Sequence, residues 1–342
     1  MSLRKKKTLS KWNEMIEEFR ALGGVADNIE QRCGALGRGL FPVDPKKPVR
    51  IFVPENLLIN VKDIVFENGV LRVKKGASVG ERERSLFEYF QNELSWGNGG
   101  KSDCEEFFDR TDTLPEHVRD LLVRDLRLAW LGDPNKGDDR TQARFVSSRM
   151  IAYGDGHVLM PVLELANHGV NGCSYDFKGG VSIQGSFKAE VLAHYGTVDP
   201  LGTFENWGFA SSEPVAFSLP ATLMVGSRSL GIARDIFKKH TRGNFRIPVL
   251  DTDETKVCIS HLMLGHARFP RLSKGIFYKL MKDIGEPRAE AIFDEIRRYN
   301  IQKFLKLMEA VDGHQGPMIS TLRQMCRHQI SAITHSIGTR EI

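Results

Sequence analysis

Residues 161–168 read PVLELANH, and residues 194–196 read HYG. An apolar run that ends in an Asn–His pair is unusual, because both polar side chains need hydrogen-bond partners once they leave water. The apolar character of residues 157–163 predicts a strand. We therefore expect a strand here, followed by a functional site at Asn167 and His168.

Length and composition describe a folded chain of one large domain or of two domains of ordinary size, and we expect two. The chain has 342 residues, of which 41% are hydrophobic and 27% are charged, as in ordinary globular proteins. No apolar run reaches the roughly 20 residues that a membrane helix needs, and the basic N-terminus lacks the apolar core of a secretory signal. We therefore expect no membrane partner and an intracellular location, in the cytoplasm or alternatively in the nucleus.

Charge and cysteine content exclude two further classes. The formal net charge is +5, less basic than in dedicated nucleic-acid binders, so we expect no nucleic-acid partner. The cysteines stand singly in the sequence, without the paired spacing of a structural zinc site or a disulfide framework. We expect reduced thiols and no metal at Cys33, Cys104, Cys173, Cys258 and Cys326.

Hydrophobic spacing predicts strands mixed with helices up to about residue 225, and mainly helices beyond it. Strands are expected at 34–41, 49–53, 157–163, 173–177, 181–187 and 188–195. A hairpin is expected at 64–73, where Asn68-Gly69 suits a type I′ turn. Helices are expected at 11–22, 81–94, 115–130, 141–151, 227–240, 260–266, 274–284, 287–307 and 317–337.

Several polar residues and one glycine-rich segment are candidates for chemistry. The glycines of residues 34–40 let a backbone approach a ligand closely, although a tight turn between strands also explains them. Arg149, Glu164 and Asn167 together offer a fixed cation, an acceptor and an amide, the set that a zwitterionic ligand requires. His168 has no second ligand beside it for a metal, and Tyr195 closes a strand.

These segments, taken together, resemble the SET-domain methyltransferases, specifically the subclass related to the Rubisco large-subunit lysine methyltransferase. The resemblance covers roughly residues 26–220. The matching segments follow one another in order: GRGLF at 37–41, VP at 53–54 with LLI at 57–59, SR at 148–149, PVLELANH at 161–168, HYG at 194–196 and WGF at 207–209.

The resemblance implies an α+β fold. Residues 1–25 would form a basic N-terminal segment and helix, and residues 26–225 a β-rich SET domain with a helical insertion at about 75–150. In such folds a following strand threads the Asn–His segment as a pseudoknot, an exception to the rule against threaded connections. Residues 226–342 would form a mainly α-helical substrate-binding domain.

The resemblance also implies a cofactor, S-adenosylmethionine, and a protein substrate. The backbone around Arg38 and Gly39 would cradle the cofactor, and Arg149 with Glu164 would hold its methionine end. Asn167 and His168 would bind its amino and adenine-side groups. Tyr195 would be the catalytic tyrosine and would also contact the cofactor.

The implied activity is methylation of a lysine in a non-histone protein, by a monomer and without a metal. The substrate pocket would include Trp207 and Phe209, where the subclass commonly has Tyr-Gly-Phe. This departure leaves open histidine methylation, which one branch of the subclass performs. A non-catalytic module that binds a protein partner is the other alternative.

Overall fold

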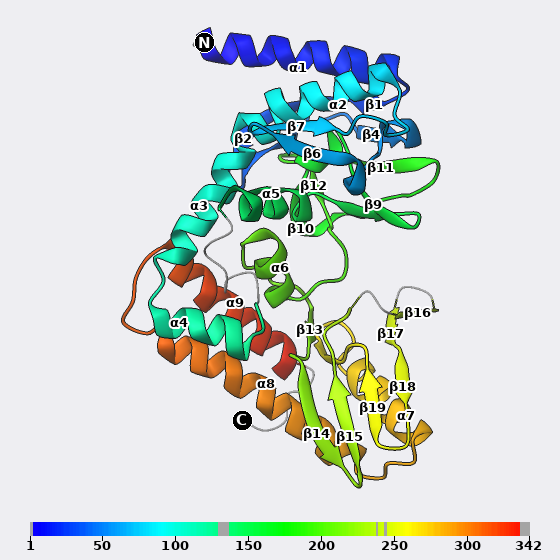
Figure 1. Ribbon diagram of the computed structural model, residues 1–342, viewed down its shortest axis with the longest axis vertical. Helices are drawn as coiled ribbons and strands as arrows, with labels where there is room; N and C mark the ends of the chain where they lie inside the picture. Colours follow the sequence, from blue (N-terminus) through cyan, green and yellow to red (C-terminus); the bar gives the residue numbers. More distant parts are fainter. Residues whose placement is uncertain (1–2, 129–136, 237–238, 243–244, 336–342) are drawn as a thin grey trace. The chain divides into compact units, whose positions relative to one another are not determined.

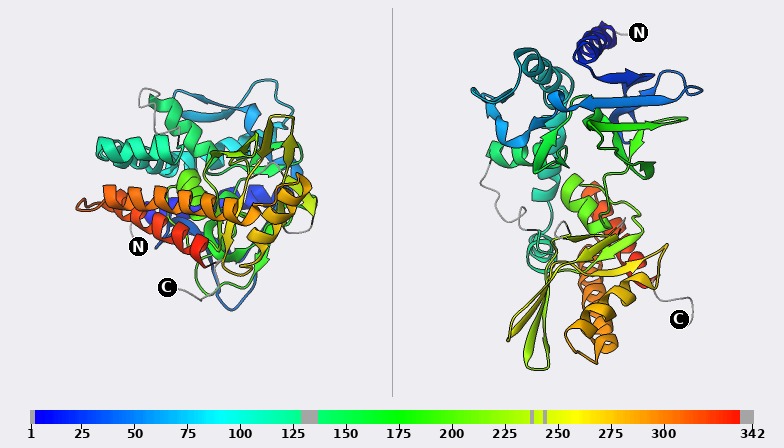
Figure 2. Two further views of the ribbon diagram at one scale, coloured as in Figure 1. Left: turned by 90° about the horizontal axis from the view of Figure 1, so that it is seen from below. Right: turned by 90° about the vertical axis from the view of Figure 1, so that its right-hand side faces the viewer.

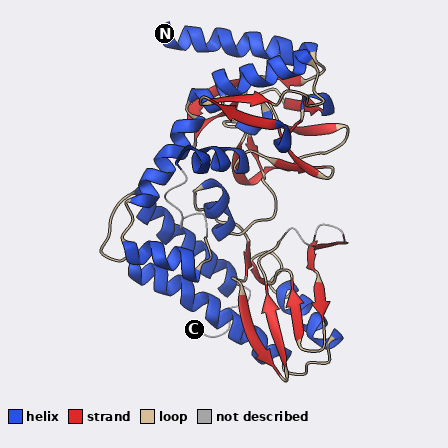
Figure 3. Ribbon diagram, in the orientation of Figure 1, coloured by secondary structure: helices blue, strands red, loops and turns tan. Residues whose placement is uncertain are grey.

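The computed structural model describes residues 3–128, 137–236, 239–242 and 245–335. Contacts divide the chain into two units: Met1–Phe108 with Lys136–Gly196, and Asp109–Asn135 with Thr197–Ile342. Each unit contains both helices and strands, as Figure 3 shows. The domains expected from the sequence, with bounds at residues 25 and 225, divide the chain differently from these two units, and they remain predictions.

The first unit consists of short sheets covered by helices (Figure 1). Its strands are β1 Val25–Asp27, β2 Ile29–Gly34, β3 Gly37–Pro42, β4 Val49–Pro54, β5 Ile59–Asn60, β6 Ile64–Glu67, β7 Val70–Val73, β8 Ile151–Tyr153, β9 Gly156–Leu159, β10 Asn167–Cys173, β11 Gly180–Gly185 and β12 Leu192–Ala193. Its helices are α1 Leu3–Ala21, α2 Glu81–Leu94 and α5 Gly137–Ser147, and α3 Gly100–Asp112 begins in this unit and ends in the second.

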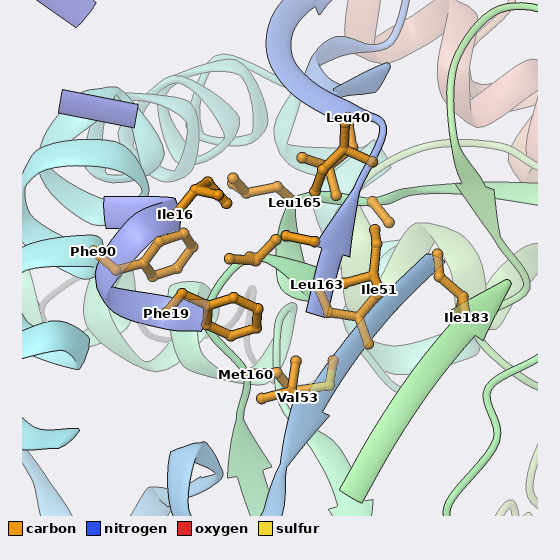
Figure 4. Close-up of a cluster of buried hydrophobic side chains, with 14 of the residues drawn as sticks. Ile16, Phe19, Leu40, Ile51, Val53, Phe90, Met160, Leu163, Leu165 and Ile183 are labelled. Atoms are coloured by element: carbon orange, nitrogen blue, oxygen red, sulfur yellow. The ribbon is translucent and has the colours of Figure 1, made fainter. Parts of the chain in front are cut away.

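A core of apolar side chains from α1, α2 and the strands fills the first unit (Figure 4). In β4, Val49, Ile51 and Val53 are fully buried because alternate side chains of a strand point to one face. This strand lies between β1 and β11 in an antiparallel sheet. Phe19 of α1 is also fully buried, so the helix is held to the sheet by its apolar face.

Local signals confirm several predicted elements. The hairpin of β6 and β7 turns at Asn68 and Gly69, which have φ of 52° and 77°, as a type I′ turn requires. Helix α2 spans the predicted residues 81–94.

The strand expected at 157–163 is confirmed only as far as Leu159. After it, Leu163 N donates to the carbonyl of Pro161 at 2.7 Å across a γ-turn whose central residue, Val162, has φ 67° and ψ −61°. A 3₁₀ turn at Leu163–Leu165 follows. Thus the apolar run buries its side chains in a bend and not in a strand.

The second unit contains helices and three sheets in its described residues. Two of these sheets have two strands each, and the third has four. Its helices are α4 Glu116–Asp120, α6 Pro200–Trp207, α7 Leu272–Asp283, α8 Ala289–Ala310 and α9 Pro317–Thr334. Its strands are β13 Val215–Phe217, β14 Ala221–Val225, β15 Arg228–Ile232, β16 Lys239–Arg242, β17 Phe245–Pro248, β18 Leu250–Thr252, β19 Lys256–Ile259 and β20 Met263–His266. Helices α8 and α9 lie side by side (Figure 2).

The helices expected at 227–240 and 260–266 are wrong, so residues 226–342 are not mainly helical up to residue 266. Gly226, with φ 63°, begins a tight hairpin between β14 and β15. In β15 the buried side chains Leu230 and Ile232 alternate, and in β19 Val257 and Ile259 do the same. This two-residue period is that of strands. The three helices after residue 271 confirm the helices expected at 274–284 and 287–307, and the helix expected at 317–337 as far as Thr334.

A buried ion pair holds the second unit together. The Asp199 carboxylate accepts from Arg234 at 2.6 and 3.1 Å, from Gln329 at 2.8 Å and from the backbone N–H of Phe217 at 3.0 Å. It also caps α6 by accepting from Gly202 N. Although burial opposes ionisation of Asp199, the contacts with Arg234 and the other donors lower its pKa.

Candidate functional site

The Asn–His pair lies at the start of β10, in the first unit. Strand β10 is parallel to β12, with Asn167 opposite Leu192 and His168 opposite Ala193. The backbone N–H of Val191 donates to the carbonyl of Leu40 in β3 at 2.8 Å. The glycine-rich hairpin of β2 and β3 therefore meets the strand that precedes Tyr195.

Asn167 joins two segments that are far apart in the sequence. Its Nδ2 donates to the carbonyl of Arg38 at 3.0 Å and to Oε1 of Glu190 at 2.6 Å. A Cβ added at Gly39 would stand 2.8 Å from Nδ2 of Asn167 and closer still to Oε1 of Glu190. A side chain at position 39 would displace the ends of the Asn167 and Glu190 side chains, so glycine permits this contact as it stands.

Only the backbone of Arg38 takes part in this contact, because its side chain is bound elsewhere. The guanidinium donates to Asp103 at 2.7 Å and to the carbonyl of Ser95 at 3.3 Å. That the backbone around Arg38 and Gly39 cradles a cofactor stays a prediction.

Glu164 lies in the 3₁₀ turn before the Asn–His pair. Its carboxyl oxygens accept from Ser95 Oγ at 2.6 Å and from Gln91 Nε2 at 2.9 Å. Burial raises the pKa of Glu164 to about 7, although nearby Arg149 and these two donors act in the opposite direction. At neutral pH this carboxyl is therefore divided between its protonated and ionised forms.

Arg149 follows α5 and is held against it. Its guanidinium lies 4.1 Å from the centre of the Phe145 ring and donates to Ser148 Oγ at 2.9 Å. Its charge affects both Glu164 and Tyr195. Arg149 therefore lies near enough to act on both groups, and its role with Glu164 in one binding site stays a prediction.

Tyr195 and His168 contact each other at the end of β12. The hydroxyl of Tyr195 donates to the carbonyl of Ala166 at 2.8 Å, and its backbone N–H donates to Nδ1 of His168 at 3.4 Å. Burial raises the pKa of Tyr195, with Arg149 acting against it and the charge of Glu190 adding to it. The phenol is thus neutral and turned toward a backbone carbonyl.

The structure brings together seven predicted site residues in the first unit: Arg38, Gly39, Arg149, Glu164, Asn167, His168 and Tyr195. Trp207 and Phe209 belong to the second unit, where their rings stack with centroids 6.3 Å apart. Their placement in a substrate pocket remains a prediction.

Sequence reasoning missed Glu190, Gln91, Ser95 and Tyr175. Tyr175 and Tyr195 pack against the same core, and burial together with the neighbouring Tyr195 raises the pKa of Tyr175. Glu190 precedes β12 in a polar turn and has no distinguishing neighbours in sequence. Only its contact with Asn167 reveals its position.

The described residues contain neither a cluster of metal-ligating side chains nor a membrane-spanning helix. No group of three or more His, Cys, Asp or Glu side chains in these residues could hold a metal ion. No helix among them is long and apolar enough to cross a membrane. The five cysteines are free.

Comparison with known proteins gave two similarities, while no family model matches the chain. Over 110 residues, 31% of this chain, it is 31% identical to an uncharacterized protein of Aquifex aeolicus (strain VF5), and the match covers 90% of that protein. Among solved structures, it is similar to the SET domain of LSMT bound to lysine and AdoHcy. That similarity covers 96% of this chain and 90% of the other, with a TM-score of 0.42 and 12% identity.

Proposed function

The chain belongs to the same family as the Aquifex aeolicus protein, and we propose that it is a protein methyltransferase that uses S-adenosylmethionine. One observation carries the proposal: the glycine-rich hairpin, the Asn–His pair and the tyrosine meet in one unit. Asn167 bonds the backbone of Arg38, and Tyr195 bonds the residue that precedes Asn167.

The donors and acceptors of this site fit the amino-acid end of the cofactor. Its ammonium group needs acceptors, which the Arg38 carbonyl and the Glu190 carboxylate supply where Asn167 now donates. Its carboxylate needs a cation, which Arg149 supplies. Arg38, Arg149 and Glu190 would hold the amino-acid end of the cofactor.

The bound cofactor would supply a methyl group on a positively charged sulfur. The protein's task is then to align a neutral nitrogen with that methyl group, which removes much of the entropic cost of the reaction. The Tyr195 oxygen, which keeps its lone pairs while its proton faces Ala166, accepts weak C–H···O contacts that steady the methyl group. No strong base is needed if burial of the substrate lysine lowers its pKa from about 10.4.

The finer parts of the proposal follow the resemblance in sequence. We propose a SET-type fold with a pseudoknot, supported by the parallel pairing of β10 with β12. We propose lysine in a non-histone protein as the substrate, with Trp207 and Phe209 in its pocket and residues 226–342 binding the protein. We also propose that the protein is a monomer and that it acts inside the cell.

Two measurements test the function. Calorimetric titration with S-adenosylmethionine should give saturable binding to the wild-type protein and at least tenfold weaker binding to Glu190→Ala. Mass spectrometry of proteins incubated with labelled cofactor should find methylated lysine. Methylated histidine without methylated lysine would overturn the choice of lysine, and absence of cofactor binding would favour a non-catalytic module.

A further inference from the structure

A groove of about 610 Å³ lies on the second unit, along one side of α7. Figure 1 shows the position of this helix. It is formed by the chain segment that enters α7 and by the first two turns of the helix. Phe269 is 48% exposed and its ring packs against His266, with centroids 4.9 Å apart. With the partly buried Leu272 and Ile276, it gives the groove an apolar surface.

Three cations border this apolar surface: Arg268, Arg271 and Lys279. All three are exposed, and no acidic residue lines the groove. Arg271 and Lys279 form no ion pair with any described residue. Lys274 of the same helix, by contrast, pairs with Glu290 at 2.5 Å. Helix α7 also begins here, at Leu272, and a helix N-terminus adds partial positive charge.

Gly275 lines the groove. It lies inside α7, where glycine is unfavourable compared with alanine. A Cβ at this position would meet nothing within 4 Å, so close packing does not explain the glycine. It lies among the lining residues, where a large side chain would occupy the groove.

We propose that this groove binds an acidic segment of a protein partner, in which an apolar side chain is flanked by carboxylates. The apolar side chain would enter between Phe269 and Ile276, and the carboxylates would pair with Arg271 and Lys279. The groove lies within residues 226–342, so this inference rests on the protein-binding role proposed for them. Its lining residues are separate from those proposed for methyl transfer, so methyl transfer and copolymer binding can each fail alone.

The test uses fluorescence anisotropy of the full-length protein with labelled synthetic polymers. The probe is a random copolymer of glutamate and tyrosine, and polyglutamate of equal length tests charge alone. We expect the copolymer to bind at least tenfold more tightly than polyglutamate. Equal binding of the two polymers, or no binding of the copolymer, would overturn the proposal.

Variants of α7 locate the binding. Gly275→Trp fills the groove without changing its charge, and Lys279→Glu reverses one cation. Each should weaken copolymer binding at least tenfold. Lys282→Glu is the matched control, because it makes the same charge change on the same helix outside the lining residues, and it should change binding less than twofold.

Two outcomes would assign the groove differently. If Lys279→Glu and Lys282→Glu weaken copolymer binding equally and Gly275→Trp has no effect, the copolymer is attracted unspecifically to a basic surface. That result would refute binding in the groove. If phosphatidylserine vesicles bind the protein, the copolymer does not, and Gly275→Trp abolishes vesicle binding, the groove binds a membrane surface and not an acidic peptide. Thermal unfolding of each variant verifies that it is folded.

Discussion

Replacing the carboxyl of Glu164 with an amide should make the protein more stable at neutral and alkaline pH. Burial raises the pKa of this group from 4.5 to about 7. The folded state therefore binds more protons than the unfolded state between these two values. Stability contributed by the protonated form is present below about pH 4.5 and is lost as the pH rises through 7.

The magnitude follows from the shift. One pKa unit corresponds to about 1.4 kcal/mol, so ionising Glu164 in the folded protein costs about 3 kcal/mol. Glu164→Gln resembles the protonated form and cannot ionise. Within the described residues Gln91 Oε1 is buried without a hydrogen-bond partner. It could accept from the new amide if the Gln91 side chain rotated by half a turn.

The assay is urea unfolding of the wild type and of Glu164→Gln across this pH range, followed by the fluorescence of Trp12 and Trp96 in the first unit. The two proteins have the same ionisable groups apart from residue 164. The effects of these groups therefore cancel in the difference between the two free energies of unfolding. That difference should move in favour of Glu164→Gln by about 3 kcal/mol on raising the pH from 4.5 to above 7. A difference independent of pH, or one that moves in favour of the wild type, would refute the reasoning.

Three other substitutions have defined outcomes. Gly39→Ala places a Cβ against Asn167 and Glu190, so S-adenosylmethionine should bind at least tenfold more weakly by calorimetry; unchanged binding would separate the glycine from the cofactor. Tyr195→Phe should lower methyl-transfer turnover at least tenfold and change cofactor affinity less than twofold, and equal loss of both would indicate a structural role. Asp199→Asn leaves the buried Arg234 without its counter-charge and should cost about 3 kcal/mol in urea unfolding at pH 7. Because the folded pKa of Asp199 is lowered, its stabilisation is present above the unfolded pKa and lost at lower pH, so the cost should shrink in acid.

Local chemistry made part of the fold predictable. The turn at Asn68-Gly69 and the helix at 81–94 depend on backbone preferences and side-chain spacing that neighbouring residues provide. The strands β15 and β19 were missed because their apolar residues lie within short segments, where the periods of helix and strand are hard to distinguish. The hairpin signal at Gly226-Ser227 was present and was read as the start of a helix.

The site was predictable where a motif marks it and not elsewhere. Asn167 was noticed because a polar pair ends an apolar run. Glu190 accepts from the same amide, yet its position is set only by the folded chain. The bend at Val162 was also missed, because positive φ is rare for a β-branched residue and no propensity predicts it. Buried surroundings fix that conformation.

The bond between Asn167 and the Arg38 carbonyl spans 129 positions of the chain. Closing so long a loop is costly in entropy, so contacts of this kind form after local hairpins and helices. Glu190 and Val191 must also be in place, because they fix the amide and the edge of β3. A nascent chain that has not yet emerged as far as residue 191 therefore lacks the site, however well its early strands have folded.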